Sequence, residues 1–373
     1  MHMNVIKRPQ YIFRRTEKND FEAVNCAYNE FTGRTRTLDQ YLWQWVNTPF
    51  EPSESWVIEH ADSKDIVGHH GVMALSFKEK GKSILVGKTE NTFVLTGHSK
   101  KLYYPRFEKI ALKKMKNKFI YIYTTSPNAG KGAVGILRRR LGYSAVGRKA
   151  CFCLYASRKA IKKIVSERFP FLRSVSGFLG TFHSILQRTN QMKSFFQVRQ
   201  TEVVPLSWSQ IDEVEEFWKY HSKNYGITAD RTSAYIKWRY ADNPYSIYDL
   251  VRLIRKNQIL GYAVLENQKV KIDGMDFSSI IVDDLIVANG SEECFYAAFS
   301  SLTHYLSTSE LVLFLTLIQN DSVNRAIRRF LGPLKKWHTK ESNEILVWGN
   351  SKKKSSWYYT NILSEGIMSD EKR

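Results

Sequence analysis

The sequence is poor in cysteine and in long apolar runs, and its acidic residues are outnumbered by basic ones. Only four cysteines occur, and no two of them are spaced as CxxC, which argues against a structural zinc site or a thioredoxin-like redox centre. The longest apolar stretch, 311–318, is interrupted by Thr316 and is far shorter than a membrane span. We therefore expect no metal and a reduced, cytoplasmic setting.

The N-terminal residues 1–15 are polar and basic and lack the apolar core of a signal peptide. The whole chain has 56 Lys and Arg against 36 Asp and Glu, which gives a formal net charge of +20. Such a surplus favours polyanionic partners, among them nucleic acid, an anionic membrane surface, a nucleotide sugar and coenzyme A. A length of 373 residues with 43% hydrophobic residues indicates two globular domains.

An internal repeat is the strongest pattern in the sequence. Three segments of the first half recur in the second half, in the same order and at offsets close to 190 residues. They are WQWVNTPF (43–50) with WRYADNPY (238–245), IVGHHGVM (66–73) with ILGYAVLE (259–266), and ILRRRLGY (136–143) with AIRRFLGP (326–333). Since three ordered matches at nearly the same offset are improbable by chance, the chain is predicted to hold two copies of one domain.

Each copy has the pattern of a mixed sheet, in which strands joined by hairpins are followed by strands that alternate with helices. An amphipathic helix is expected near the start of each copy, at 208–221 in the second. The strands expected in the first copy are 55–59, 66–77, 83–95, 119–124 and 150–155, with helices at about 103–117 and before Tyr143. The predicted fold class is therefore α/β.

This order of elements resembles the GNAT family of acetyl-CoA-dependent N-acetyltransferases, over both copies. The resemblance rests on a central strand at 89–95 that runs into a basic loop, on Pro127 and Asn128 before a helix, and on the Leu-Gly-Tyr at 141–143 that ends this helix. It implies two GNAT-like domains in tandem, with acyl-CoA as the cosubstrate. The Arg-Gly-x-Gly that is usual in the family's loop is absent here.

The resemblance also implies a set of CoA-binding residues. A loop that opens a helix offers free N–H groups and a partial positive charge, which suit a diphosphate. Backbone amides of the central strand would hold the pantetheine arm and polarise the thioester carbonyl. The implied residues are Phe93, Val94 and Leu95 on the strand, Gly97, His98, Ser99, Lys100 and Lys101 in the loop, and Asn128 on the pantetheine arm.

The corresponding loop of the second copy, 288–293, ends in Glu292 and Glu293. Two carboxylates would repel a diphosphate. We therefore expect one CoA site, in the first copy, and a second copy that shapes the acceptor pocket.

Candidate catalytic residues lie on and beside the central strand. Glu90, next to Asn91, is the first candidate for a general base, although an exposed strand carboxylate fits the pattern equally well. His69 and His70 lie on the neighbouring strand and are expected on opposite faces of the sheet. Many family members protonate the leaving thiolate with a tyrosine, and that position is Arg138 in this chain.

In the second copy, Asp283 and Asp284 end a buried-looking strand, and alternation predicts that one of them faces the cleft, where it could bind an acceptor. Capping of a loop or helix is the alternative role. Trp238, Arg239 and Tyr240 are expected to be mainly structural. Arg239 and Tyr240 are also candidates for substrate binding, through a phosphate on Arg239.

The two copies are joined by a basic segment. Residues 156–200 contain nine Lys or Arg and one acid, with phenylalanines interleaved. We expect a helical linker packed between domains, and a peripheral membrane contact is the alternative. The expected boundaries are 1–157 for the first domain, 158–200 for the linker, 201–350 for the second domain and 351–373 for a tail.

Among tandem proteins of this kind, the chain is most similar to bacterial nucleotide-sugar N-acyltransferases of surface-glycan synthesis. The resemblance implies transfer of a 3-hydroxybutanoyl or acetyl group to the amine of a sugar such as dTDP-3-amino-3,6-dideoxygalactose. A FemX-type aminoacyl-tRNA-dependent transferase is one alternative, but the sequence shows no heptads for that family's helical arm. A non-enzymatic protein that binds nucleic acid or membrane is another alternative. No nucleic-acid-binding motif is present, and nucleic acid is not an expected partner.

Overall fold

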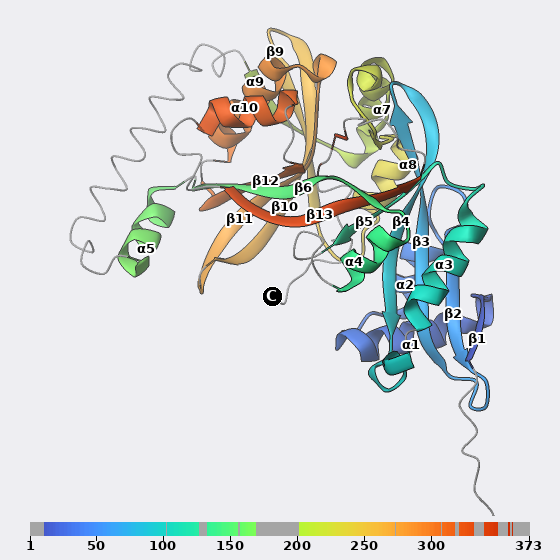
Figure 1. Ribbon diagram of the computed structural model, residues 1–373. Coiled ribbons are helices and arrows are strands. Elements are labelled where there is room, and N and C mark those ends of the chain that lie inside the picture. The colour runs from blue at the N-terminus through green and yellow to red at the C-terminus, as the bar shows by residue number, and fades with distance from the viewer. Residues whose placement is uncertain are drawn as a thin grey trace, which may run out of the picture.

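A computed structural model describes residues 11–101, 103–126, 133–155, 157–168, 201–272, 274–306, 308–317, 321–331, 339–349, 357–358 and 360. These residues form one mixed sheet of thirteen strands with helices on its faces (Figure 1). The α/β class and the mixed sheet expected from the sequence are confirmed.

The described residues of the first half form six strands, four α-helices and short 3-10 turns. In chain order they are β1 (Tyr11–Arg15), α1 (Phe21–Thr32), α2 (Leu38–Trp45), β2 (Glu54–His60), β3 (Ile66–Glu79), β4 (Lys82–Val94), the 3-10 helix η2 (Thr96–Lys101), α3 (Tyr103–Met115), β5 (Tyr121–Ser126), α4 (Ala133–Arg140) and β6 (Ser144–Tyr155). The last strand starts six residues before the position expected from the sequence.

The second half repeats this order after the connecting helix α5 (Arg158–Arg168). Its elements are β7 (Thr201–Leu206), α7 (Asp212–His221), the short β8 (Thr228–Ala229), α8 (Ser233–Ile236), the π-helix η7 (Lys237–Ala241), β9 (Tyr248–Arg255), β10 (Gln258–Ile272), β11 (Met275–Val287), the 3-10 helix η8 (Ala288–Gly290), α9 (Glu292–Tyr305), β12 (Leu311–Leu317), α10 (Ser322–Leu331) and β13 (Thr339–Gly349). The helix expected at 208–221 is divided into a 3-10 turn, Trp208–Gln210, and α7.

Equivalent strands of the two halves pair in the same register. In the first half Gly68 on β3 lies opposite Val94 on β4, and in the second half Gly261 on β10 lies opposite Val287 on β11. Gly68 and Gly261, which align in the sequence repeat, therefore hold equivalent positions in their strand pairs.

The two halves exchange their last strands. The order across the middle of the sheet is β5-β13-β6-β12, so β13 pairs with β5 of the first half and β6 pairs with β12 of the second. Figure 1 shows β6 and β13 side by side between the halves, and they pair with each other as well. The sequence predicted that 150–155 would complete its own copy, and this strand instead lies next to the second.

Two equivalent tryptophans, Trp43 and Trp238, meet where the halves pack together. Their rings stack with centroids 4.9 Å apart. Each indole donates to the other's carbonyl, from Trp43 Nε1 to Trp238 O at 3.2 Å and from Trp238 Nε1 to Trp43 O at 3.0 Å. Such a reciprocal contact is expected where two like copies are related by an approximate twofold axis.

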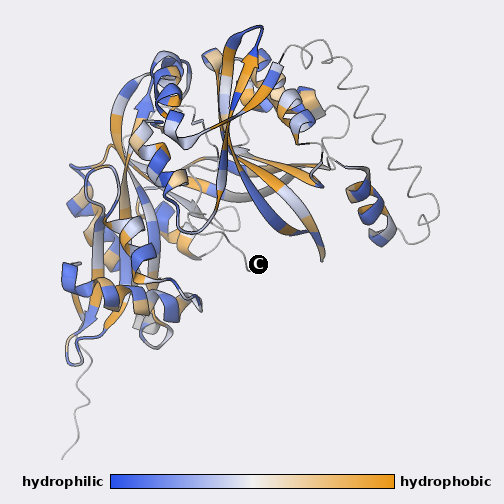
Figure 2. Ribbon diagram, turned by 180° about the vertical axis from the view of Figure 1, so that it is seen from behind, coloured by the Kyte–Doolittle hydropathy of each residue, from blue (hydrophilic) through white to orange (hydrophobic). Residues whose placement is uncertain are grey.

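One hydrophobic core runs through both halves and includes residues of β3, β4, α7, β10 and α9. A second cluster lies between the sheet and α3, around Phe107 and Ile122. In Figure 2 the strands in the middle of the sheet carry the orange, apolar stretches. The sheet and its two cores therefore form the rigid frame on which β4 is held.

The linker helix α5 is basic, as expected, and its apolar side packs against the sheet. Ala160 and Ile164 pack against Phe277 on β11 and Leu311 on β12. Because these residues are buried, the apolar face of α5 is not free to enter a membrane. The rest of the expected linker, 169–200, lies outside the described residues.

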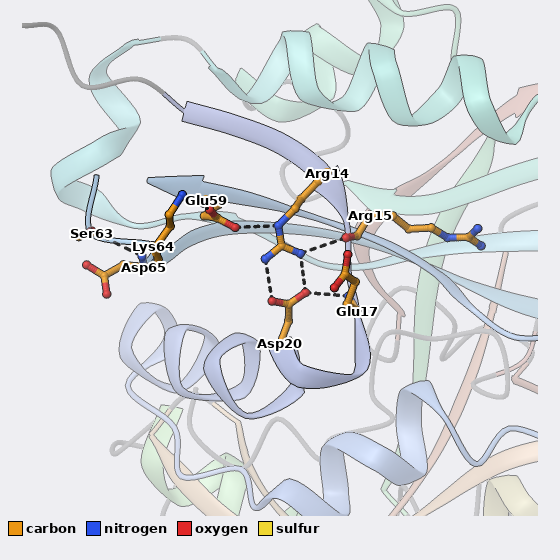
Figure 3. Close-up of polar contacts among 8 residues, drawn as sticks. All are labelled: Arg14, Arg15, Glu17, Asp20, Glu59, Ser63, Lys64 and Asp65. Carbon is orange, nitrogen blue, oxygen red and sulfur yellow. Dashed lines mark hydrogen bonds and ion pairs between the residues drawn. The ribbon is translucent and has the colours of Figure 1, made fainter. Parts of the chain in front are cut away.

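Arg14 joins three elements at the start of the sheet (Figure 3). Its guanidinium donates to both carboxylate oxygens of Asp20, at 2.6 and 2.7 Å, and its Nε donates to Glu59 on β2 at 2.7 Å. These bonds hold the pKa values of Asp20 and Glu59 below their usual range. The network fastens β1 to β2 and to the start of α1.

Replacing Arg14 with Met is expected to lower the melting temperature most at neutral pH. Because the two carboxyl pKa values are depressed in the folded chain, the stability they contribute is present above about pH 4 and is lost as the pH falls through the folded values. The difference in melting temperature between wild type and Arg14→Met should therefore shrink between pH 5 and pH 2, measured by thermal unfolding. A difference that stays constant with pH would contradict this account.

Candidate functional site

The strands β4 and β5 diverge and open a gap in the sheet. They pair in parallel only at Val86 with Tyr121, Gly87 with Ile122, and Lys88 with Tyr123. Beyond Lys88, β4 continues to Val94 along β3 alone. The edge of β4 from Thr89 onward therefore faces the gap with its backbone groups unpaired on that side.

The free part of β4 contains a bulge. The register against β3 shifts between His69 and Gly71, and Asn91 in the bulge has a φ of 47°. A positive φ is costly for most residues and is tolerated by Asn. The bulge redirects the amides that follow it, which is a common device beside functional sites.

The side chain of Asn91 contacts Trp45 and Arg36. With its amide oxygen turned toward them, Asn91 accepts from Trp45 Nε1 at 3.0 Å and from Arg36 Nη1 at 2.7 Å. Trp45 reaches this position by packing on Gly71, where a Cβ atom would lie 2.0 Å from the indole ring. The glycine is therefore needed for the indole to support the bulge.

Arg36 is buried, with 3% of its surface exposed, and it is surrounded by amides and aromatic rings. Its Nε donates to Asn25 Oδ1 at 2.7 Å and its Nη1 to Gln44 Oε1 at 3.1 Å. The guanidinium lies over the Tyr28 ring at 3.9 Å. Its Nη2 is buried and has no hydrogen-bond partner among the described residues.

Two further groups lie close to Arg36. The Tyr28 hydroxyl is influenced by Arg34, Arg36 and Glu90, and burial raises its pKa. Tyr245, from the second half, is influenced by Arg36 and Tyr28, and burial raises its pKa also. The Tyr245 hydroxyl is buried and makes no hydrogen bond within the described part of the chain. Side chains of both halves therefore line one side of the β4 bulge.

Glu90 lies one residue before Asn91 and forms an ion pair with Lys88. Both side chains are buried, with exposed fractions of 9% for Glu90 and 2% for Lys88. Residues two apart on a strand share a face. Glu90 is also close enough to influence the Tyr28 hydroxyl, so it lies on the Tyr28 side of β4.

His69 and His70 point to opposite faces of the sheet. His69 Nδ1 donates to the Asn91 carbonyl at 2.7 Å, and its ring packs against Trp45. His70 Nδ1 lies 3.1 Å from Thr92 Oγ1, and its ring packs against Phe107 on α3. Burial lowers the pKa of His69 to about 3 and that of His70 to about 4, so both imidazoles are neutral at pH 7.

The predicted amide donors are not equivalent. The Leu95 amide donates to the Val67 carbonyl at 2.8 Å, so it is not free to hold a ligand, contrary to the prediction. Strand amides alternate in direction, so Phe93 shares the β3 side with Leu95 and the Val94 amide faces the gap. The Phe93 side chain is buried against Tyr28.

The loop after β4 folds as η2 and leads directly to α3. His98 Nδ1 lies 2.9 Å from the Tyr11 hydroxyl, and its ring packs against Tyr11 and His60. A Cβ atom at Gly97 would meet nothing within 4 Å, so there is open space beside the loop. The side chains of Ser99, Lys100 and Lys101, and all of Asn128, lie outside the described residues.

Arg138 belongs to a hydrogen-bond network that joins two helices to the sheet. Its Nε donates to Glu108 on α3 at 3.0 Å, and its Nη1 donates to Thr124 on β5. Tyr143 donates to the same Glu108 oxygen at 3.2 Å. Arg138 therefore ties α4 to α3 and β5.

The equivalent gap of the second half is filled. β11 leaves β12 after Val282, and a register shift follows between Val264 and Leu265 on β10. Tyr358 donates to the Leu285 carbonyl and Thr360 donates to Asp284 Oδ1 at 2.7 Å, so C-terminal residues cover this part of β11. A nearby cavity of about 20 Å³ has room for little more than a water molecule.

The acidic pair of the second half is buried. Asp284 makes a two-point ion pair with Arg231, at 3.0 Å for both bonds, and Asp283 has no exposed surface. The bulge at Asp283 breaks the alternation from which one of the two carboxylates was predicted to face the cleft. Arg239 and Tyr240 are also buried, so none of these four residues faces open solvent.

At the start of α9, Ser291 caps the helix and Glu292 forms an ion pair with Arg325 at 2.8 Å. The two acids expected to repel a diphosphate therefore do lie in the first turn of this helix. Within the described part of the chain, no group of three or more His, Cys, Asp or Glu could hold a metal ion. No described helix is both long and apolar enough to cross a membrane.

No protein-family model and no curated protein matches the chain, but solved structures do. A GCN5-related N-acetyltransferase from Anabaena variabilis has a TM-score of 0.60 at 9% identity, covering 91% of this chain and 72% of its own. One from Kribbella flavida has a TM-score of 0.56 at 11% identity, covering 91% and 71%. Saccharomyces cerevisiae N-myristoyltransferase, solved with bound myristoyl-CoA, has a TM-score of 0.52 at 10% identity, covering 98% and 91%.

These identities are low, so the likeness shows the fold alone. The chain has the fold of the GCN5-related N-acetyltransferases. The resemblance read from the sequence is confirmed at this level.

Several residues of the site were not predicted from the sequence. They are Tyr28, Arg36, Gln44, Trp45, Lys88 and Tyr245. A signal for Arg36 was present, because Arg-Thr occurs at 36–37 and again at 231–232, just before the repeated tryptophan segment. In both places the threonine caps a helix.

Proposed function

We propose that the protein is an acyl-CoA-dependent N-acyltransferase made of two GNAT-like copies, with one donor site at the gap between β4 and β5. The observation that carries this proposal is the bulged end of β4, which is no longer paired with β5 and directs the Val94 amide away from β3. The filled gap of the second half supports a single donor site.

The charge and the position of the proposed donor site suit coenzyme A. The basic loop 96–101 follows β4 and precedes α3, so the free N–H groups at the start of this helix lie beside the end of the gap. The Val94 amide would hold the pantetheine arm or the thioester carbonyl. The acidic first turn of α9 makes the second copy unsuitable for a diphosphate.

The reaction needs a neutral amine and a place for its proton. The amine nitrogen forms a bond to the thioester carbon, the carbonyl electron pair moves to oxygen, and its return expels the CoA thiolate. Glu90, on the Tyr28 side of β4, would take the proton that the nitrogen loses. A thiol has a pKa of only about 8.5, so the leaving thiolate needs little help from an acid, and Arg138 need not supply one.

For the acceptor, the proposal is a nucleotide-linked deoxy amino sugar such as dTDP-3-amino-3,6-dideoxygalactose, with a 3-hydroxybutanoyl or acetyl donor. The net charge of +20 and Arg34 near Tyr28 suit a diphosphate-bearing acceptor. Tyr245 supports a contribution of the second half to the pocket. We place the reaction in the cytoplasm, and propose any membrane contact only for residues 169–200.

One CoA molecule per chain is expected to bind, and the Lys100→Glu/Lys101→Glu variant should bind it more weakly by about tenfold or more, because two favourable charges become repulsive. Isothermal titration measures both quantities. The matched control is Lys113→Glu/Lys114→Glu, which makes the same change at the exposed far end of α3 and should leave the affinity unchanged. No heat with the wild type at millimolar CoA would refute the proposal.

The acceptor is tested separately. Release of CoA thiol is followed with acetyl-CoA or 3-hydroxybutanoyl-CoA and the dTDP amino sugar, and the matching sugar without its amino group is the control. Turnover only with the amine supports the acceptor class. Turnover with simple amines and none with the nucleotide sugar would leave an acyltransferase and reject the sugar.

A further inference from the structure

Arg36 and Arg231 hold equivalent positions in the two halves. Each precedes a threonine that caps a short helix, and each reaches the bulged strand of its own half. Both guanidinium groups are buried, with exposed fractions of 3% and 0%. The residues that they meet on the bulge also correspond, Asn91 for Arg36 and Asp284 for Arg231.

The two arginines differ in whether a carboxylate balances their charge. Arg231 has a carboxylate, Asp284, at 3.0 Å on two atoms. Arg36 is bonded to neutral oxygens only, those of Asn25, Gln44 and Asn91. Among the described residues no carboxylate lies within ion-pair distance of it.

The carboxylate next to Asn91 in the sequence is already paired with another cation. Glu90, the residue before Asn91, forms its ion pair with Lys88. Burial lowers the pKa of Arg36, whereas Asp284 raises that of Arg231 despite burial. A buried cation without a counter-ion is costly, and neighbouring dipoles recover only part of its lost hydration.

We propose that the charge of Arg36 stabilises the negative oxygen that forms at the β4 bulge during acyl transfer. The charge is available for this role because Asn91, unlike an aspartate, does not neutralise it. This inference rests on the proposed function. The oxygen is that of the thioester carbonyl, which takes the electron pair when the amine nitrogen bonds to carbon and returns it as the bond to sulfur breaks. Arg36 acts through its charge, in a site of low dielectric, and not through direct contact with the substrate.

Asn91→Asp is the test, because it copies the arrangement of the second half and keeps a residue that accepts a positive φ. Neutralising Arg36 should raise the melting temperature, on the order of 5 °C. It should lower kcat about 10²-fold with the amine acceptor and also lower the slow hydrolysis of acetyl-CoA by water, with little change in KM. A purely structural role of Arg36 would not link higher stability to lower kcat.

The reverse exchange in the second half is the matched control. Asp284→Asn should lower the melting temperature, because it leaves Arg231 buried without its carboxylate. Opposite shifts for the two exchanges support the inference, whether or not an acceptor is known. An Asn91→Asp variant that is not stabilised would overturn it.

The kinetic outcomes decide the role. A rise in acceptor KM with unchanged kcat would overturn the proposal, because the charge would then serve an anionic group of the acceptor. Unchanged kcat and KM would overturn it too. Failure of the wild type to bind or hydrolyse acetyl-CoA would reject the proposed function itself, and the two melting temperatures would still show whether Arg36 carries an unneutralised charge.

Discussion

A Glu90→Gln variant is expected to transfer acyl groups about 10²- to 10⁴-fold more slowly than the wild type at pH 7, because it removes the carboxylate that takes the amine proton. Glutamine has the same shape, so the packing around Tyr28 should be kept, although the change removes the carboxylate that pairs with the buried Lys88 and should lower the melting temperature. The donor site is untouched, and the affinity for CoA should stay the same by titration.

The pH dependence distinguishes a base from a structural residue. An amine that is already neutral needs less help, so the deficit of Glu90→Gln should narrow as the pH rises past about 8. Glu216→Gln on α7 makes the same chemical change at a site with 73% of its side chain exposed, and it should leave kcat unaltered. A deficit of equal size from pH 6 to pH 10 would show that Glu90 has another role.

Replacing Trp238 with Ala is expected to cost about 3–5 kcal/mol of unfolding free energy, because it removes a large buried ring and leaves Trp43 without its stacking partner. Trp238→Phe keeps a ring and removes only the N–H donor. This variant should cost about 1–3 kcal/mol, since the Trp43 carbonyl is left buried without a donor.

Thermal unfolding of both variants, with Trp208→Ala as a control, measures these effects. Trp208 is only partly buried, so its loss should cost less. Because β6 and β13 belong to one sheet shared by both halves, the Trp238→Ala variant should still unfold in a single transition. Two separate transitions would show that the halves are independent units, contrary to this description.

Much of the fold could be predicted because its signals are local. The apolar alternation that marks β3 and β4, and the spacing of the tryptophan segments, depend only on nearby residues. The exchange of β6 and β13 could not be predicted in this way. Since these strands are equivalent in the repeat, each fits its own copy and the other copy with the same apolar pattern.

The site was predicted in part, for a similar reason. Glu90, Asn91 and His69 were singled out by their place on neighbouring strands, and they do lie together around the bulge. Arg36 was missed, because the sequence does not show that a charged residue near a helix start will be buried. One of Asp283 and Asp284 was expected to face a cleft, and both are instead buried beside a bulge in β11.

The shared middle of the sheet has a consequence for synthesis on the ribosome. The free edge of β5, complete at Ser126, obtains its partner only when β13 emerges, beginning at Thr339. At about 5–20 residues per second, this interval of roughly 210 residues takes on the order of 10–40 s. During that time the nascent first half carries an open strand edge, so chaperone capture or premature pairing with another nascent chain should be greatest in this window. For the same reason, a gene cut between the halves would yield two fragments that must find each other before the shared sheet is complete.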